Sequence, residues 1–360
     1  MTNAPDPPAD FDPSPTSFPP PSGRRGWAIA LQLLGFLVGM GLLGACAYLA
    51  LSNPKYREQI ARLAEAPWPN LLGLLALSAA TIAISGLTFA AILRPVRKLS
   101  RLDCVAVNGV CSMLSYLPFK MSLVFRVYFH HRRDGLAVMV ISGWIGATGL
   151  AILAGLGPVL LASLWRGKVD ALWWMVAIGG MFVAGGTLVL VARFLSSPRG
   201  WRLLLLAAEG TRLRFARRAV ESRWFANLHQ GVHMLASPRA VGEALVLRTA
   251  DITIQAARFY LAARTIDVAL TPEQAVLAGV VYFFLQGTAP TGVAGAREAG
   301  TASVLALMQG ENLVVVVLAV SAAEGTMNLV MGAAGAIWIR VDRLFMGRNV
   351  GLVPGAPGPA

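Results

Sequence analysis

The sequence predicts an all-α, polytopic integral membrane protein, and three observations support this prediction. Hydrophobic residues make up 56% of the chain and charged residues only 14%, whereas soluble domains carry about 25% charged residues. The mean hydropathy is +0.62. Several uncharged apolar segments are longer than about 20 residues, which is enough to cross a bilayer core of about 30 Å. These values exclude a water-soluble globular protein.

The charge is strongly basic, with 31 Lys and Arg against 18 Asp and Glu and a net charge of +13. The basic residues lie in the gaps between apolar segments, as the positive-inside rule and attraction to anionic lipid headgroups require. We therefore expect anionic lipids, and not nucleic acid, at the basic face. Cys46, Cys104 and Cys111 lie in apolar segments, which indicates packing residues and no disulfide framework or metal site.

The first 26 residues contain eight prolines and three aspartates and few large apolar side chains. Such a segment cannot bury enough apolar surface to fold, so we expect a disordered cytoplasmic tail over 1–26. Arg24 and Arg25 directly precede the first apolar segment, which places the N-terminus in the cytoplasm. That apolar segment is too long for the core of a cleavable signal peptide.

We expect six full spans, each an apolar segment long enough to cross the membrane. The second span is followed by four basic residues within eight positions, which places its end on the cytoplasmic side. The segment between the first two spans, 53–67, mixes both signs of charge and is expected to be a connecting loop. The six expected spans cover residues 27–52, 71–93, 136–165, 171–192, 240–263 and 313–339.

Nine arginines lie between Arg193 and Arg239. Apolar residues recur there every three or four positions, so residues 199–236 are expected to include a basic amphipathic helix on the cytoplasmic face. Two interpretations stay open: specific contact with lipid, or a positive-inside loop that is helical. His229 and His233 are four positions apart, but no third ligand is nearby, so we predict no metal site.

The fifth span is apolar overall and yet contains polar residues at intervals of three and four positions. These residues, Arg248, Asp251, Gln255 and Arg258, share one face of a helix. Because charges inside a membrane are unfavourable unless they face a cavity or one another, this face is a candidate functional surface. The alternative is an internal Arg248–Asp251 ion pair that only orients the helix.

Two segments, 102–133 and 271–309, are too polar and too interrupted for ordinary spans. Thr271-Pro272-Glu273-Gln274 has the pattern of a capping box with proline at the first helical position, which fixes a helix start. The apolar arms on either side of each interruption are short for a crossing, so we expect two re-entrant helical hairpins that line a cavity.

With both segments counted as hairpins, every basic cluster falls on one side and both termini are cytoplasmic. Each half of the chain then contains a span, a span, a hairpin and a span, with opposite starting sides. This is the pattern of an inverted repeat, in which interrupted segments at matching positions mark a transporter's binding site.

Residues 289–298 carry a proline, a glycine-rich loop and then Gly295, Ala296, Arg297 and Glu298 at the start of a helix. This motif resembles that of the lysylphosphatidylglycerol synthase transmembrane family, a flippase-like domain, over most of residues 27–339. The first interrupted segment departs from the family pattern, because Leu123-Val124-Phe125 precede Arg126 where the family has Gly-Glu. The resemblance implies a protein of the bacterial inner membrane that binds phospholipid or a lipid-linked compound, with movement of that lipid across the membrane as the further expectation.

Bifunctional members of that family carry a soluble aminoacyltransferase domain after the membrane part. Here residues 340–360 form a short basic segment and then a Gly/Pro-rich tail, so we expect no lysyl transfer. The sequence contains no Ser/His/Asp or Cys/His set and no carboxylate pair at catalytic spacing, so we expect no enzyme and no cofactor. The leading hypothesis is a lipid transporter, and the alternative is an assembly or regulatory protein that docks partners through the arginine-rich helix.

In the transporter hypothesis, Arg297 supplies a fork of donors to a phosphate or carboxylate headgroup. Glu298 orients Arg297 or meets a cationic headgroup, unless it is only an acid favoured by the dipole at a helix start. Glu324, near the centre of the last span, pairs with an arginine or carries a proton, and Asn328 faces the same way one turn later. The predicted substrate-binding residues are Arg297, Glu298, Gly292, Gly295, Pro290, Arg126, Arg248, Asp251, Arg258 and Glu324.

Overall fold

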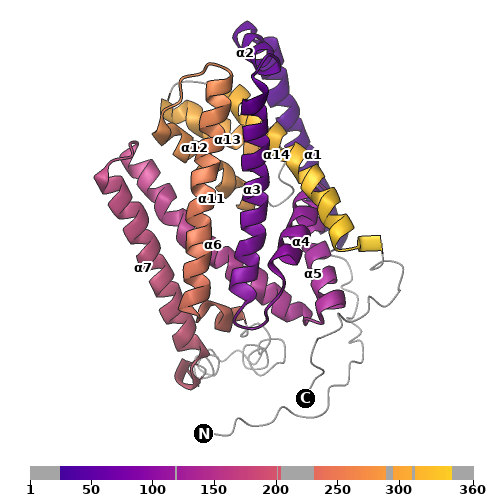
Figure 1. The fold of residues 1–360 in the computed structure, drawn as a ribbon, viewed down its shortest axis with the longest axis vertical. Helices are drawn as coiled ribbons and strands as arrows, with labels where there is room; N and C mark the ends of the chain where they lie inside the picture. Colours follow the sequence, from indigo (N-terminus) through magenta and orange to yellow (C-terminus); the bar gives the residue numbers. More distant parts are fainter. Residues whose placement is uncertain are drawn as a thin grey trace.

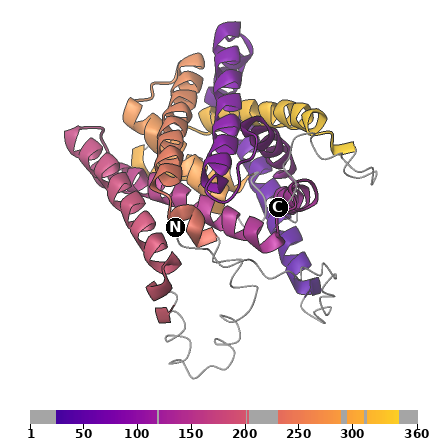
Figure 2. The same ribbon diagram turned by 60° about the horizontal axis from the view of Figure 1, so that its bottom comes forward.

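In the computed structural model, the residues whose structure is described are 25–117, 120–200, 202–203, 231–288, 295–309 and 313–342. Helices account for all the regular secondary structure in these ranges, and they pack as a bundle (Figure 1 and, turned by 60°, Figure 2). This confirms the prediction of an all-α, polytopic architecture.

Five of the six expected spans appear as helices that are long and apolar enough to cross a membrane. The sixth, α11 (Pro238–Thr265), has 28 residues, which at about 1.5 Å per residue exceeds a bilayer core of about 30 Å. α11 differs from the other five in composition, because several of its residues are charged and buried. The five are α1 (Arg25–Ser52), α3 (Trp68–Leu93), α6 (Val138–Arg166), α7 (Ala171–Ser196) and α14 (Val314–Trp338).

The outer surface of the bundle is apolar and part of its interior is ionised, the reverse of a soluble protein. Phe182, Leu307 and Ile337 are 74%, 87% and 78% exposed, while Arg248, Arg258 and Arg297 are among the largest fully buried side chains. Hydrocarbon around the bundle would favour this arrangement, because apolar side chains can face lipid while ionised groups must find partners inside.

Residues expected to form a loop after the first span instead form a short helix, α2 (Pro54–Ala64). The side chain of Asn53 accepts a hydrogen bond from the backbone of Lys55 at 3.0 Å, and Pro54 occupies the first helical position. These are standard N-terminal helix signals, and they override the mixed charge of the segment. The prediction of a loop at 53–67 was wrong for these residues.

The two interrupted segments are pairs of short helices, as predicted. The first pair is α4 (Arg101–Leu114) and α5 (Met121–Asp134), and the second is α12 (Pro272–Thr288) and α13 (Ala296–Gln309). The backbone N–H of Thr271 donates to the side-chain oxygen of Gln274 at 2.8 Å, and the backbone N–H of Gln274 donates to the hydroxyl of Thr271 at 3.3 Å. These reciprocal hydrogen bonds confirm the capping box. Figure 1 shows α4 and α5 in its lower half and α12 and α13 in its upper half.

The end of the bundle drawn lowest in Figure 1 is held together by charged groups, and we call it the arginine-rich end. Arg94 at the end of α3 and Arg101 at the start of α4 both pair with Glu243 of α11, at 3.2 and 2.8 Å. Asp103 of α4 accepts hydrogen bonds from Arg133 of α5 and Trp338 of α14, both at 2.9 Å. The start of α4 and the end of α5 therefore lie side by side, so the first pair is an antiparallel hairpin.

Small residues let α4 approach its neighbours closely. A Cβ on Gly109 would lie 2.7 Å from the carbonyl oxygen of Met331, and a Cβ on Gly335 would lie 2.4 Å from that of Ala106. On the other side of α4, a Cβ on Gly86 of α3 would lie 2.6 Å from the Cα of Val105. These close contacts bury α4, the first helix of the hairpin, between α3 and α14.

The order of elements repeats along the chain: α1, α3, the α4–α5 hairpin and α6, then α7, α11, the α12–α13 hairpin and α14. The inverted relation between these halves stays a prediction. Three further predictions fall mostly outside the described residues: the N-terminal tail, the basic amphipathic helix within 199–236 and the C-terminal tail. The predicted site residues Pro290 and Gly292 also lie outside them.

Candidate functional site

The centre of the bundle contains one carboxylate shared by two arginines. Glu324 of α14 accepts a hydrogen bond on Oε1 from Arg297 Nη1 of α13 at 2.6 Å. Its Oε2 accepts one from Arg258 Nη2 of α11 at 2.8 Å. All three side chains are buried. This confirms that Glu324 pairs with an arginine, and it shows that one carboxylate ties three helices together.

Arg297 is fully engaged by protein groups. Its Nε and Nη2 donate to Oε1 of the adjacent Glu298 at 3.1 and 2.8 Å, and Nη2 also donates to the hydroxyl of Ser321 at 3.1 Å. The guanidinium lies 4.2 Å from the ring centroid of Tyr282, within the range of a cation–π contact. Every guanidinium nitrogen therefore has a partner, and Glu298 orients Arg297, as one of its expected roles required.

Gly295 directly precedes α13 and has a backbone conformation that only glycine adopts readily. Its φ is +88°, and an added Cβ would lie 1.6 Å from the carbonyl oxygen of Gly39 in α1. The Gly295 N–H donates to Oε2 of Glu298 at 2.6 Å. Gly295 therefore bends the backbone and packs closely against α1, and its contact with a substrate stays a prediction.

The predicted polar face of α11 is buried in the bundle. Arg258 Nη1 donates to Gln255 at 2.8 Å, one turn before it on the helix. Arg248 forms an ion pair with Asp251 through Nη1 and Oδ2, and its guanidinium lies 4.3 Å from the ring centroid of Phe283. The ion pair leaves Arg248 Nε, Arg248 Nη2 and Asp251 Oδ1 without hydrogen-bond partners among the described atoms. Arg248 thus has two buried nitrogen donors whose hydrogen bonds are unsatisfied among the described atoms.

Arg126 of α5 is buried without an acidic partner among the described residues. Its Nη2 donates to Oδ1 of Asn108 at 2.7 Å, and its guanidinium lies 3.7 Å from the ring centroid of Phe89. Asn108 is itself fixed, because its Nδ2 donates to the carbonyl oxygen of Ile82 at 2.8 Å. Nη1 of Arg126 has no partner in the described structure. An unpaired buried guanidinium is unfavourable unless an anion can approach it.

A cavity of about 200 Å³ lies among these groups. It is lined by residues of α3, α4, α6, α11, α12 and α14, including Phe89, on which Arg126 stacks. Of the predicted site residues, Arg248 and Glu324 line it, whereas Arg126, Asp251, Arg258 and Arg297 do not. The main polar residues of the lining are Asn108, Arg248, Gln255, Gln286, Glu324 and Asn328.

The inner ends of both hairpins meet one turn of α14. Gln286, near the end of α12, donates to Glu324 Oε1 at 3.3 Å, and Arg297 at the start of α13 reaches the same oxygen. One turn later, Asn328 Nδ2 donates to the hydroxyl of Tyr116, which follows α4, at 3.0 Å. This turn therefore joins the two interrupted segments at the cavity.

Sequence reasoning missed Asn108, Gln286, Tyr116 and Ser321, which complete the site. Asn108 and Gln286 each left a signal, because a polar amide in an otherwise apolar helix needs a buried partner. Tyr116 and Ser321 left none, since hydroxyl groups in helices often bond to their own backbone.

The site carries one net positive charge when its ionised groups are counted. Arg258 and Arg297 are balanced by Glu298 and Glu324, and Arg248 is balanced by Asp251. Arg126 has no such counterpart among the described residues. A polar cavity with a surplus guanidinium and free Arg248 donors is chemically suited to an anion such as a phosphate.

Comparison with known proteins adds one finding. A family model described as "Lysylphosphatidylglycerol synthase TM region" matches residues 32–332. A search of curated proteins and a search of solved structures each returned no match.

Proposed function

The chain belongs to the lysylphosphatidylglycerol synthase transmembrane family, and on that premise we propose that it is a lipid transporter. The family supports a role connected with membrane lipids. In our proposal the central cavity binds the headgroup of a phospholipid or lipid-linked compound while the acyl chains stay in the bilayer. The headgroup then passes between leaflets past the inner ends of the two hairpins.

The observation that supports this proposal is the surplus of positive charge beside the cavity. A phosphate there would compensate Arg126 and accept hydrogen bonds from the free donors of Arg248. Glu324 limits how tightly it binds, because the carboxylate lines the same cavity and repels an anion. Weak binding of this kind suits transport, since a substrate that is held too tightly is not released.

The protein is proposed to lie in the bacterial inner membrane with the arginine-rich end facing the cytoplasm. Both hairpins are then re-entrant, the first from the cytoplasmic side and the second from the opposite side. Their inner ends form the non-helical part of the path, which is tolerated at membrane depth when protein or a wet cavity surrounds it.

Headgroup-labelled lipid exchange in proteoliposomes tests the proposal. Arg126→Gln removes the surplus charge, and the double substitution Arg248→Gln with Asp251→Asn removes both members of an ion pair and so keeps the site's charge unchanged. Losing a charge-assisted hydrogen bond should slow the exchange of an anionic lipid by at least about tenfold. Arg264→Gln is the matched control, because Arg264 lies on the same helix as Arg248 but is exposed.

Each variant must remain folded, which its thermal unfolding in detergent will show. If the folded native protein exchanges none of the anionic, zwitterionic or polyprenyl-linked lipids, transport is refuted. If exchange occurs but is equal in all variants, the headgroup does not pass through this cavity.

A further inference from the structure

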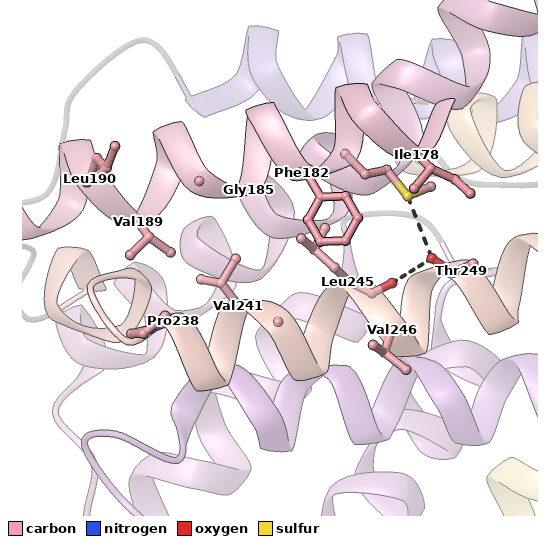
Figure 3. Close-up of a pocket in the computed structure, with 13 residues that line it drawn as sticks. Ile178, Phe182, Gly185, Val189, Leu190, Pro238, Val241, Leu245, Val246 and Thr249 are labelled. Carbon is pink, nitrogen blue, oxygen red and sulfur yellow. Dashed lines mark hydrogen bonds between the residues drawn. The ribbon is translucent and has the colours of Figure 1, made fainter. Parts of the chain in front are cut away.

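A second hollow lies between α7 and α11, on the outside of the bundle. Its volume is about 640 Å³, roughly three times that of the central cavity. Phe182 and Val189 of α7 point toward Val241 and Leu245 of α11 across it (Figure 3). We call it the α7–α11 groove.

The groove is apolar along its whole length. Among the described residues that line it, Thr249 is the one with a hydroxyl, which donates to the carbonyl oxygen of Leu245 at 3.0 Å and to the sulfur of Met181 at 3.6 Å (Figure 3). None of these described lining residues is charged. It therefore offers nothing to a headgroup or to water.

Glycines create the hollow. A Cβ on Gly185 would lie 2.5 Å from Cδ1 of Leu245, so the two helices touch at this point and close the floor of the groove. A Cβ on Gly186 or on Gly242 would meet nothing within 4 Å, although both residues line the groove. Because glycine has no side chain, these two positions leave the space open. A larger residue at either position can fill the space without disturbing helix packing.

The exposure and the length of the groove indicate which ligand would fit it. Phe182 and Val246 at its margins are 74% and 71% exposed, so in a membrane the groove opens toward lipid hydrocarbon. From Ile178 to Leu190, α7 runs about 18 Å at 1.5 Å per residue, which is close to one leaflet of a bilayer core about 30 Å thick. A single acyl chain matches this length and apolarity.

Basic groups lie at the end of the groove formed by Leu190 and Pro238. Arg193 follows Leu190 by three positions, and its Nε donates to the carbonyl oxygen of Ala236 at 3.1 Å, which brings it beside the start of α11. Arg239 directly follows Pro238. Both arginines are exposed. An anionic headgroup can meet them at the membrane surface while its acyl chain extends along the groove.

We propose that the α7–α11 groove holds one acyl chain of an anionic phospholipid from the leaflet at the arginine-rich end, with its phosphate at Arg193 and Arg239. The site is distinct from the central cavity, because α11 presents Leu245 and Thr249 to the groove but Arg248 and Gln255 to the cavity. Occupancy of the groove therefore does not depend on transport.

Photolabelling of the full chain in proteoliposomes tests the acyl-chain site. The probe is phosphatidylglycerol with a diazirine on one acyl chain, and labelled peptides are identified by mass spectrometry. We expect labels to concentrate on the lining residues of α7 and α11. In Gly186→Leu and in Gly242→Leu, the new leucine should displace about two methylene groups of the acyl chain from the groove. Labelling should therefore fall about tenfold in each variant.

Gly179→Leu is the matched control, because Gly179 also lies on α7 in open space but does not line the groove. Its labelling should equal that of the native chain. Equal labelling of the groove-filling variants, or labels spread evenly over all outer helix faces, would refute the site. Groove-filling variants that turn a dimer into a monomer, with no concentrated label, would assign the groove to a second copy of the chain.

The headgroup is tested separately with phosphatidylcholine carrying the same diazirine. The native chain should prefer phosphatidylglycerol, and the double variant Arg193→Gln with Arg239→Gln should lose this preference while the groove still labels. Equal labelling of the native chain by both lipids would refute the anionic headgroup. Because labelling needs no movement between leaflets, a protein that labels but does not exchange lipid would refute the proposed transport and leave this site intact.

Discussion

Asn328 and Tyr116 are 212 positions apart, and yet the side-chain amide of Asn328 donates to the hydroxyl of Tyr116 at 3.0 Å. This bond attaches the inner end of the first hairpin to α14, one turn from Glu324, which holds the second hairpin. The two interrupted segments therefore share one turn of one helix. A change in either hairpin can reach the other through α14.

Charge balance at Glu324 should dominate stability. Glu324→Gln leaves Arg258 and Arg297 with one carboxylate, and Arg297→Gln leaves an unpaired carboxylate, so each should lower the free energy of unfolding by about 3 kcal/mol or more. The double variant restores neutrality and should lose less than the sum of the two single variants. Thermal unfolding in one detergent measures all three.

The control for this prediction is Arg62→Gln. Arg62 pairs with Glu58 and Asp267, both at 2.8 Å, but these groups are largely exposed. Its loss should change the unfolding free energy by less than about 1 kcal/mol. Additive effects of Glu324→Gln and Arg297→Gln would contradict the shared charge network.

Close backbone contact at the first hairpin should make Gly335 intolerant of a side chain. Gly335→Ala places a methyl group against the carbonyl oxygen of Ala106, so we expect a loss of about 1–3 kcal/mol in the free energy of unfolding. Gly325→Ala on the same helix should be nearly neutral, since its Cβ would meet only the Tyr116 hydroxyl at 3.6 Å. Similar unfolding temperatures for the two variants would show that α4 and α14 are not held at this distance.

Stability should fall in acid partly because of Asp170, at the turn between α6 and α7. The hydrogen bond from Arg166 and then that from the Trp173 backbone hold the pKa of Asp170 below its usual range. Since the folded-state pKa is depressed, this contribution is present above the unfolded-state pKa of about 4 and is lost as pH falls below it.

Asp170→Asn keeps the helix cap but removes the charge. Its unfolding temperature should therefore be lower than that of the native protein at pH 7, and the difference should shrink progressively as the pH falls from about 4 to about 2. A constant difference across this pH range would mean that ionisation of Asp170 does not contribute.

Cysteine accessibility should establish the sidedness of the bundle. Cys46, Cys104 and Cys111 are buried, so a membrane-impermeant maleimide should react mainly with introduced cysteines. Lys98→Cys and Arg132→Cys flank the first hairpin and should react from the same side. Glu58→Cys and Lys168→Cys should react from the other. Opposite reactivity of Lys98→Cys and Arg132→Cys would show that the first interrupted segment crosses the membrane.

Much of the architecture was predictable because its signals are local. Long apolar segments predicted the spans, and the capping box at Thr271 fixed the start of α12. The prediction of a loop at 53–67 was wrong because Asn53 and the proline after it, which both stand in the sequence, cap and begin a helix. The three- and four-residue spacing on α11 correctly placed Arg248, Asp251 and Arg258 on one face that is buried. The spacing could not show which of them lines the cavity and which belongs to the ion pairs around Glu324.

The sequence alone determined that this chain is a helical membrane protein with two interruptions and buried charge, because hydropathy, caps and helical spacing are properties of neighbouring residues. Only the tertiary structure decided that Glu324 satisfies Arg258 and Arg297 while Arg126 keeps Asn108 and Phe89. Those pairings depend on which helix faces meet, and that is set by glycine contacts between distant segments. The α7–α11 groove also exists only in the tertiary structure, because Gly186 and Gly242 leave it open only where α7 and α11 lie side by side.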